Sequence, residues 1–415
     1  MKKISILFLI SIWSVNAQQV ELDHCLNQVT THYPLFKQKN IEKEINEISK
    51  KINQNAWLPQ VAINGQATYQ SDVTQVNIPN STIEPLSKDQ YKMYLDVNQT
   101  VYDGGLTKIK NDLQNISSQI NNSQVEIEIR NIKQQTQKYF FNALVAQENL
   151  TIYKTSQNEI KERIKVLAAG VKYGTVKQSQ IDILEVELYK TDQKIIQTEF
   201  NKKIAIEVIN LFTGLSIDAS SNFIIPTEIP ILENNFENRP EYKKFNFQKE
   251  SLDKNYDLTT SKLLPKVNLF GQGGYGKPGL NQMSNQFDSY YIVGAKLNWD
   301  ISSFYNKNKN KKITELQKNS IDVQKESFEF NLKSQRISLD QNSNQLVELI
   351  EKDKKIVDLR KNISKVAASE LDNGIITSTS FLIEQNAETQ AKQSLVIHQI
   401  QKLETQYDIK LLTGN

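Results

Sequence analysis

The sequence contains two copies of one unit, and this internal repeat restricts the possible folds more than any other feature. The sequence NLFTG at 210–214 recurs as KLLTG at 410–414, and LP at 58–59 recurs as LP at 264–265. These landmarks keep their order, and small insertions account for the differences in their offsets. A repeat of this length predicts that each copy folds into the same supersecondary unit.

The repeat and the composition of the first residues predict a division of the chain. Lys2 and Lys3 precede a short apolar run that ends at Val15-Asn16-Ala17, which is typical of a cleaved signal peptide. We expect a signal peptide at 1–17, a first repeat at 18–216, a linker at 217–238 and a second repeat at 239–415.

Long stretches of the chain lack the residues that break helices. No proline occurs between Leu86 and Ile225 or after Gly279, and the only glycines between Leu106 and Phe212 are Gly170 and Gly174. A helix of 60 residues would be about 90 Å long, which favours a coiled-coil or tube-like architecture. Apolar residues at heptad spacing predict three packing seams: Ile41, Ile45, Ile48, Ile52; Ile181, Leu184, Leu188, Ile195; and Ile400, Leu403, Tyr407, Leu411.

Four segments instead alternate apolar and polar residues with a period of two. They lie at about 60–71, 90–101, 265–276 and 289–299, and aromatic residues sit near their ends. Each has the length of a tilted membrane strand with one face toward lipid. A soluble hairpin with one buried face is the alternative interpretation. Four strands cannot close a barrel and open edges are not tolerated in lipid, so a membrane barrel requires several chains.

The composition gives no indication of catalysis or of nucleic-acid binding. Without Lys2 and Lys3, 48 basic residues balance 47 acidic ones, and a net charge near zero gives no reason to expect nucleic acid. The single cysteine, Cys25, fits a small buried apolar residue. Its spacing to the three histidines predicts no metal site. The glycines at 271–276 lie in and after a strand without a following helix, so no dinucleotide site, cofactor or enzyme activity is expected.

Several short motifs, in their order and duplication, resemble the TolC family of trimeric outer-membrane efflux and secretion channels. The resemblance covers nearly the whole mature chain. The motifs are 27–34 at the start of the first helix, Trp57-Leu58-Pro59, the sequence QTVYDGG at 99–105, GVKYGTV at 170–176, QIDIL at 180–184 and LLTG at 411–414.

The resemblance implies a mainly α-helical fold with a small contribution to a membrane β-barrel. Each chain would form two tandem helix–strand–strand–helix repeats, and a homotrimer would complete one 12-stranded barrel and a long α-helical coiled-coil barrel. The protein would lie in outer-membrane lipid, extend into the periplasm, and expose loops at 72–90 and 276–288. It would reach an inner-membrane pump through a periplasmic membrane-fusion adaptor.

The resemblance also assigns the adaptor contact to two helical tips. The glycines there allow the positive φ that a tight reversal between helices often needs. The residues implied are Tyr173, Gly174, Thr175, Val176, Asn373, Gly374, Ile375 and Ile376. For the two isoleucines, a contact within the turn is the alternative.

The expected pore constriction departs from the family pattern. Some family members carry aspartates after the second tip, where this chain has Ser380 and Ile383. Asp182, after the first tip, is the nearby carboxylate. An aspartate gate is therefore not carried over, and these three residues stay as candidates for the constriction.

We therefore expect a passive exit duct for small toxic compounds in a tripartite efflux system. A duct for type I protein secretion uses the same tunnel and stays open as an alternative. A soluble periplasmic coiled-coil adaptor or scaffold is the alternative from another class, and it predicts no integral membrane strands.

Overall fold

The computed structural model describes residues 18–74, 85–230 and 235–414. The expected signal peptide and part of the first expected loop lie outside these residues. The described chain forms two compact units, and each unit contains segments from both sequence repeats. We call them the strand unit (Gln38–Gln124 and Glu241–Ser327) and the helical unit (the remainder).

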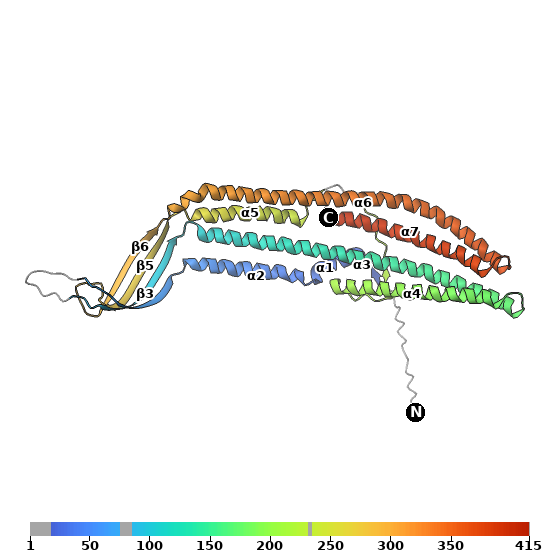
Figure 1. Cartoon of the computed structure of the whole chain (residues 1–415), viewed down its shortest axis with the longest axis horizontal. Coiled ribbons are helices and arrows are strands. Elements are labelled where there is room, and N and C mark those ends of the chain that lie inside the picture. Colours follow the sequence, from blue (N-terminus) through green and yellow to red (C-terminus); the bar gives the residue numbers. More distant parts are fainter. Residues whose placement is uncertain (1–17, 75–84, 231–234, 415) are drawn as a thin grey trace, which may run out of the picture. The chain divides into compact units, whose positions relative to one another are not determined.

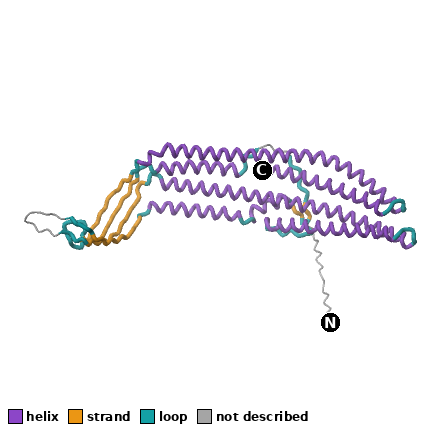
Figure 2. Tube along the Cα trace, in the orientation of Figure 1, coloured by secondary structure: helices purple, strands orange, loops and turns teal. Residues whose placement is uncertain are grey.

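The strand unit contains one four-stranded sheet in the order β2-β3-β5-β6, with every neighbouring pair antiparallel. Its strands appear in orange in Figure 2, and its helices continue from one end of the strands. The elements are α2 (Leu35–Gln54), η1 (Asn55–Trp57), β2 (Gln60–Tyr69), β3 (Asp89–Tyr102), α5 (Pro240–Ser261), β5 (Lys266–Lys277), β6 (Asp288–Asn298) and η2 (Ser302–Asn306).

The strand register places the apolar residues of all four strands on one face. Ile63 pairs with Leu95, Leu95 with Gly273, and Gly273 with Tyr291. Because successive side chains point to opposite faces, the neighbouring row lies on the other face, where Gln272 Nε2 donates to Asp96 Oδ1 at 3.0 Å. A shift of one residue would exchange the two faces, so the pattern strongly specifies this register.

Polar contacts fix the points where strands become helices. Gln99 Nε2 donates to the Trp57 carbonyl at 2.6 Å, and Trp299 Nε1 donates to the Leu263 carbonyl at 2.9 Å. The Asp103 carboxylate accepts from the backbone N–H groups of Gly105 and Thr107 at 2.8 and 2.7 Å, at the start of α3. Burial alone would raise the pKa of Asp103, but these hydrogen bonds outweigh it and lower the pKa.

Two uninterrupted helices, α3 (Leu106–Lys172) and α6 (Lys307–Asp372), contribute residues to both units, which confirms the expectation of very long helices. The helical unit also contains α1 (Leu22–His32), α4 (Gln178–Thr213) and α7 (Ser378–Thr413), all labelled in Figure 1. Among the described helices, none combines the length and apolarity needed to span a membrane.

The main core of the helical unit joins both repeats around aromatic side chains. The Phe140 ring packs edge-on against Phe223 with ring centroids 5.2 Å apart, and Phe141 packs against Tyr407. Cys25 is fully buried in the same cluster, as the sequence predicted. Burial raises the pKa of its thiol to about 12, so the thiol stays protonated and inert.

The first part of the expected linker packs into this core, which sequence patterns did not indicate. Ile217 and Phe223 are buried. The short strand β4 (Asn222–Phe223) pairs in parallel with β1 (Gln19–Val20). Gln147 closes the arrangement, because its amide accepts from the Phe223 N–H at 2.8 Å and donates to the Phe223 carbonyl at 3.1 Å. The linker boundaries themselves stay a prediction.

The repeated Thr-Gly pair at 213–214 and 413–414 ends α4 and α7. Both threonines are buried, and each hydroxyl donates to the carbonyl four residues earlier, at 2.7 Å for Thr213 and 3.2 Å for Thr413. Both glycines adopt the left-handed conformation that ends many helices. The repeated motif therefore ends both helices with the same local geometry.

Two of the three predicted seams are confirmed within the chain. Residues of the second seam, such as Leu184, and of the third, such as Leu403, are buried. The first seam differs, because Ile41, Ile45 and Ile48 on α2 are exposed in the single chain. This stripe is not covered by the described part of the chain, so its role as a packing seam stays a prediction.

Two carboxylates on α7, Glu404 and Asp408, are held in a partly buried environment. Burial, and then the charge of Asp408, raise the pKa of Glu404 to about 7. Burial raises the pKa of Asp408 to about 6, against the hydrogen bond that Gln137 Nε2 donates at 2.7 Å. Both groups bind protons more tightly in the folded state than in the unfolded state. Their contribution to stability is therefore full below about pH 4 and is lost as the pH rises through 6 to 7.

We predict that Glu404→Gln stabilises the protein at pH 8 and changes little at pH 5. The amide removes a charge that is costly to hold in the folded state, so the expected gain at pH 8 is on the order of 1–3 kcal/mol. Thermal unfolding followed by circular dichroism at the two pH values measures it. Asp358→Asn, which removes an exposed carboxylate on α6, is the control. An equal effect of Glu404→Gln at both pH values would point to packing and contradict the assignment.

Candidate functional site

The first candidate surface is the apolar face of the sheet in the strand unit. Ile63 is 71% exposed, Tyr291 77% and Val293 73%, although each lies in a regular strand. Exposed apolar side chains from all four strands form this face. Large continuous apolar patches on a protein surface mark contact with membranes or other proteins.

Both edge strands of the sheet lack a neighbour on their outer side within the described chain. Within the described chain, β2 pairs only with β3 and β6 only with β5, so both edges leave backbone groups to be satisfied elsewhere. The helices next to these edge strands in the sequence, α2 before β2 and α6 after β6, carry exposed apolar residues as well. On α2 these include Ile41 and Ile45, and on α6 they include Ile313, Leu316 and Val323.

The second candidate surface consists of two tight helix reversals in the helical unit. Residues 173–177 connect α3 to α4, and residues 373–377 connect α6 to α7. Gly174 and Gly374 have φ of 75° and 71°, and a Cβ built at either position meets no atom within 4 Å. The glycines are therefore needed for backbone conformation and not for space, as the sequence predicted.

The residues of each tip divide into exposed and packed positions. Tyr173 is 78% exposed and Ile375 is 70% exposed, whereas Val176 and Ile376 are half-buried against the apolar cluster beneath the tips. Ile375 is therefore exposed, whereas Ile376 packs against this cluster, and a docking role for either residue stays a prediction. The remaining positions stabilise the turns: Thr175 Oγ1 donates to the Gly170 carbonyl at 3.0 Å and Asn373 Nδ2 to the Ser369 carbonyl at 2.8 Å.

The two tips are joined by contacts that sequence analysis did not find. The backbone N–H of Ser378 donates to Gln180 Oε1 at 2.7 Å, and Arg163 forms an ion pair with Asp372. Below them, residues of α3, α4, α6 and α7 share one buried cluster that includes Phe381. The two members of each polar contact lie about 200 positions apart in the sequence, so no local pattern could have paired them.

The three candidates for a constriction lie within the first two turns of α4 and α7 and are exposed. Asp182 accepts from Gln178 Nε2 at 2.9 Å, and the Ser380 N–H donates to Thr377 Oγ1 at 3.3 Å as part of a helix N-cap. Ile383 is 61% exposed. Their role at a constriction stays a prediction.

An apolar groove of about 500 Å3 lies between α6 and α7 next to the second tip. Ile363, Val366 and Ile376 supply its apolar wall, and Ser380 and Glu384 supply polar groups. Arg360 holds Glu384 with an Nη1–Oε2 distance of 2.9 Å. The spacing of Ile363 and Val366 on one helix face was a usable signal for this surface.

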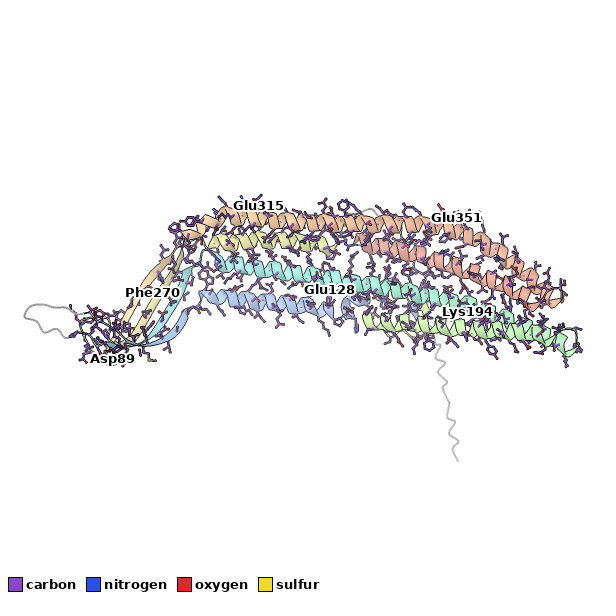
Figure 3. The ribbon with its side chains drawn as sticks, viewed as in Figure 1. Asp89, Glu128, Lys194, Phe270, Glu315 and Glu351 are labelled. Atoms are coloured by element: carbon purple, nitrogen blue, oxygen red, sulfur yellow. The ribbon has the colours of Figure 1, made fainter. Side chains whose placement is uncertain are left out.

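Figure 3 shows the side chains along the helices, with Lys194 and Glu351 among the exposed charged ones. No group of three or more histidine, cysteine, aspartate or glutamate side chains within the described ranges is placed to hold a metal ion.

Comparison with known proteins identifies the fold. No family model matches the sequence, and no curated protein matches it. Solved structures match almost the whole chain. The outer-membrane channel OprN has a TM-score of 0.71 at 13% identity, covering 95% of this chain and 89% of its own. VceC of Vibrio cholerae has 0.68 at 11%, covering 95% and 96%. The CmeC channel of Campylobacter jejuni has 0.68 at 14%, covering 95% and 85%.

The chain therefore has the fold of TolC-like outer-membrane channels. This outcome confirms the resemblance drawn from the short motifs and the predicted fold class of long helices with four strands per chain. The structurally similar proteins are channels and not enzymes.

We predict that Gly374→Val destabilises the second tip, while Gly374→Asn is milder. A β-branched residue at positive φ costs about 1–2 kcal/mol, whereas asparagine tolerates this conformation. Hydrogen exchange of residues 370–378 measures local opening and should increase several-fold for valine. Gly273→Ala, in a strand where a Cβ meets no atom within 4 Å, is the control for tip exchange. Unchanged exchange in Gly374→Val would show that the tip does not need the left-handed conformation.

Proposed function

We propose that the protein is a trimeric outer-membrane channel that serves as the passive exit duct of a tripartite efflux system for small toxic compounds. The observation that carries the proposal is the four-stranded sheet with two open edges and an exposed apolar face. In lipid, every backbone polar group must find a partner within the protein. Several copies of this sheet must therefore join edge to edge, and three copies give the 12 strands expected from the resemblance.

The helices next to the edge strands support the same assembly. The exposed stripe of α2 precedes edge strand β2, and the exposed stripe of α6 follows edge strand β6. A ring of copies that pairs β6 with the next β2 would bring these apolar stripes together. This arrangement would give Ile41, Ile45 and Ile48 the packing partner that the single chain lacks.

We further propose that the tips bind a periplasmic membrane-fusion adaptor and, through it, an inner-membrane pump. Ile375 and Tyr173 are exposed at the ends of well-packed helices, and the groove beside the second tip offers an apolar wall with polar ends. A concave apolar surface with a few polar groups is typical of a binding site. The different residues of the two tips would present two kinds of docking site in alternation around a trimer.

The membrane part of the proposal predicts opposite outcomes for two neighbouring substitutions. Ile63→Lys places a charge on the proposed lipid face, at a cost of about 2–4 kcal/mol near the middle of a bilayer. Asn64→Lys places the same charge on the polar face. We expect Ile63→Lys to reduce the trimer band on semi-native gels and the carbonate-resistant membrane fraction, and Asn64→Lys to leave both near wild type.

Equal behaviour of the two lysine variants would contradict lipid contact at the apolar face. A wild-type chain that is extracted by carbonate and migrates as a monomer would support the soluble adaptor or scaffold instead.

The efflux part of the proposal predicts a susceptibility phenotype. Deletion of the gene should increase susceptibility to one or more members of a panel of dyes, detergents, drugs and metals, because the exit path is lost. The wild-type gene should restore resistance. Ile375→Glu should restore it poorly, because a charge at the exposed tip would oppose apolar docking, while its trimer level stays normal.

Unchanged susceptibility across the whole panel would contradict general efflux. Loss of a secreted protein from the medium in the same deletion strain would favour the type I secretion duct. Full restoration by Ile375→Glu would remove Ile375 from the docking surface.

A further inference from the structure

In the strand unit, all four transitions between strand and helix lie at the same end of the strands. Gln60 at the start of β2 pairs with Asn98, Asn268 pairs with Thr100, and Lys266 pairs with Asn298. We call this region, from the ends of α2 and α5 to the starts of α3 and α6, the strand–helix junction. Figure 1 shows the helices leaving the sheet there.

The start of α6 carries an unusual concentration of positive charge. Lys307, Lys309, Lys311 and Lys312 are all exposed, and residues 301–314 contain no acidic side chain. The first acidic residue is Glu315, labelled on α6 in Figure 3, whose carboxylate lies 3.7 Å from Lys312 Nζ in an exposed pair. Among the described residues, the other three lysines of this run form no ion pair.

Helix stability does not explain these lysines. The N-terminus of a helix carries partial positive charge and favours acidic residues. The first turn of α6 contains none, and neither does the first turn of α3, which instead has exposed Lys108 and Lys110. Cations near two helix N-termini are locally unfavourable, although the Asp103 carboxylate partly offsets them at α3, so helix stability does not account for the lysines.

The other two transitions add charge of the same sign. Lys51 is exposed in the last turn of α2, and Lys262 is exposed just after α5. Asp103 accepts from backbone N–H groups at the start of α3, and Asp300 accepts from Ser302 and Ser303. Both aspartates stay charged, but the lysines named at the four transitions outnumber them. The junction therefore carries an excess of positive charge.

An independent observation, the position of exposed aromatic side chains, supports a location of this junction beside a membrane surface. Trp57, Trp299 and Tyr305 are 40%, 55% and 81% exposed at the same transitions, where the apolar face of the strands ends. Tryptophan and tyrosine prefer the boundary between hydrocarbon and water. The lysines follow these aromatic side chains on the helix side, at the level where lipid headgroups would lie.

We propose that the strand–helix junction binds the phosphate groups of anionic phospholipids in the leaflet that faces the helices. Lysine clusters next to a membrane-spanning segment attract anionic headgroups, and the attraction weakens as salt screens it. The proposal rests on the proposed function, because it requires the strands to lie in a bilayer. It adds a lipid partner and a binding surface that fix the depth of the sheet in the membrane.

The test uses purified mature protein in a neutral detergent, titrated with phosphatidylglycerol or with phosphatidylcholine of the same acyl chains. Native mass spectrometry measures lipid bound per trimer. We expect phosphatidylglycerol to bind at least about tenfold more tightly at low salt, and the preference to shrink at high salt.

The variant K307Q/K309Q/K311Q/K312Q should lose most of this preference. The matched control is K352Q/K354Q/K355Q/K361Q, which removes four exposed lysines further along the same helix and should keep it. The four-arginine variant at positions 307, 309, 311 and 312 keeps the charge and should also keep the preference. If the four-glutamine variant does not assemble, K309Q/K311Q is measured with the same expectation of a reduced preference.

Equal binding of the two lipids by wild-type trimers would overturn the proposal, as would equal loss in the junction and control variants. Polyglutamate that displaces phosphatidylglycerol at equal charge would indicate an acidic protein partner and would also overturn it. The membrane assignment fails separately, through carbonate extraction of the wild type. Loss of the lipid preference in carbonate-resistant trimers therefore reports on the junction alone.

Discussion

The structure depends on one constraint, which is that a four-stranded sheet cannot satisfy its own edges. Within the chain, β2 and β6 each have one neighbour, and the face that the strands share is apolar and exposed. Backbone groups in hydrocarbon cost several kcal/mol each when unpaired, so an isolated sheet is not stable in lipid. In the proposed assembly, the neighbouring copy that pairs with an open edge would also cover the exposed stripes on α2 and α6. Trimer formation is therefore part of the proposed folding of this chain, not a later step.

The two tips and the strand–helix junction use the long helices for different purposes. The tips lie on four helices that share one buried cluster and are joined by the Gln180–Ser378 contact. This packing leaves Tyr173 and Ile375 exposed on a rigid base, which is favourable for docking. The junction has the opposite character, because its lysines oppose the local helix dipole and have few partners in the chain. This excess of exposed positive charge is the basis of the proposed binding of anionic lipid.

Much of this could be read from the sequence because the signals are local. Missing prolines and glycines predicted α3 and α6, alternation predicted the four strands, and Gly174 and Gly374 predicted the reversals. The candidate site was only partly accessible. Exposure of Ile375 and burial of Ile376 could not be separated, because both are apolar neighbours in one turn. The Arg163–Asp372 pair and the packing of Phe223 require knowledge of which distant segments meet.

The sequence by itself determined the repeat, the type and position of the main elements and the presence of an apolar strand face, because each follows from spacing along the chain. Only the tertiary structure decided which stripes are seams within the chain and which are left open. The stripe of Ile41, Ile45 and Ile48 has the same spacing as the buried seam at Leu184, yet it is exposed. Spacing defines a face, but the helix that covers that face is set by the topology, and here the topology leaves the face uncovered within the chain.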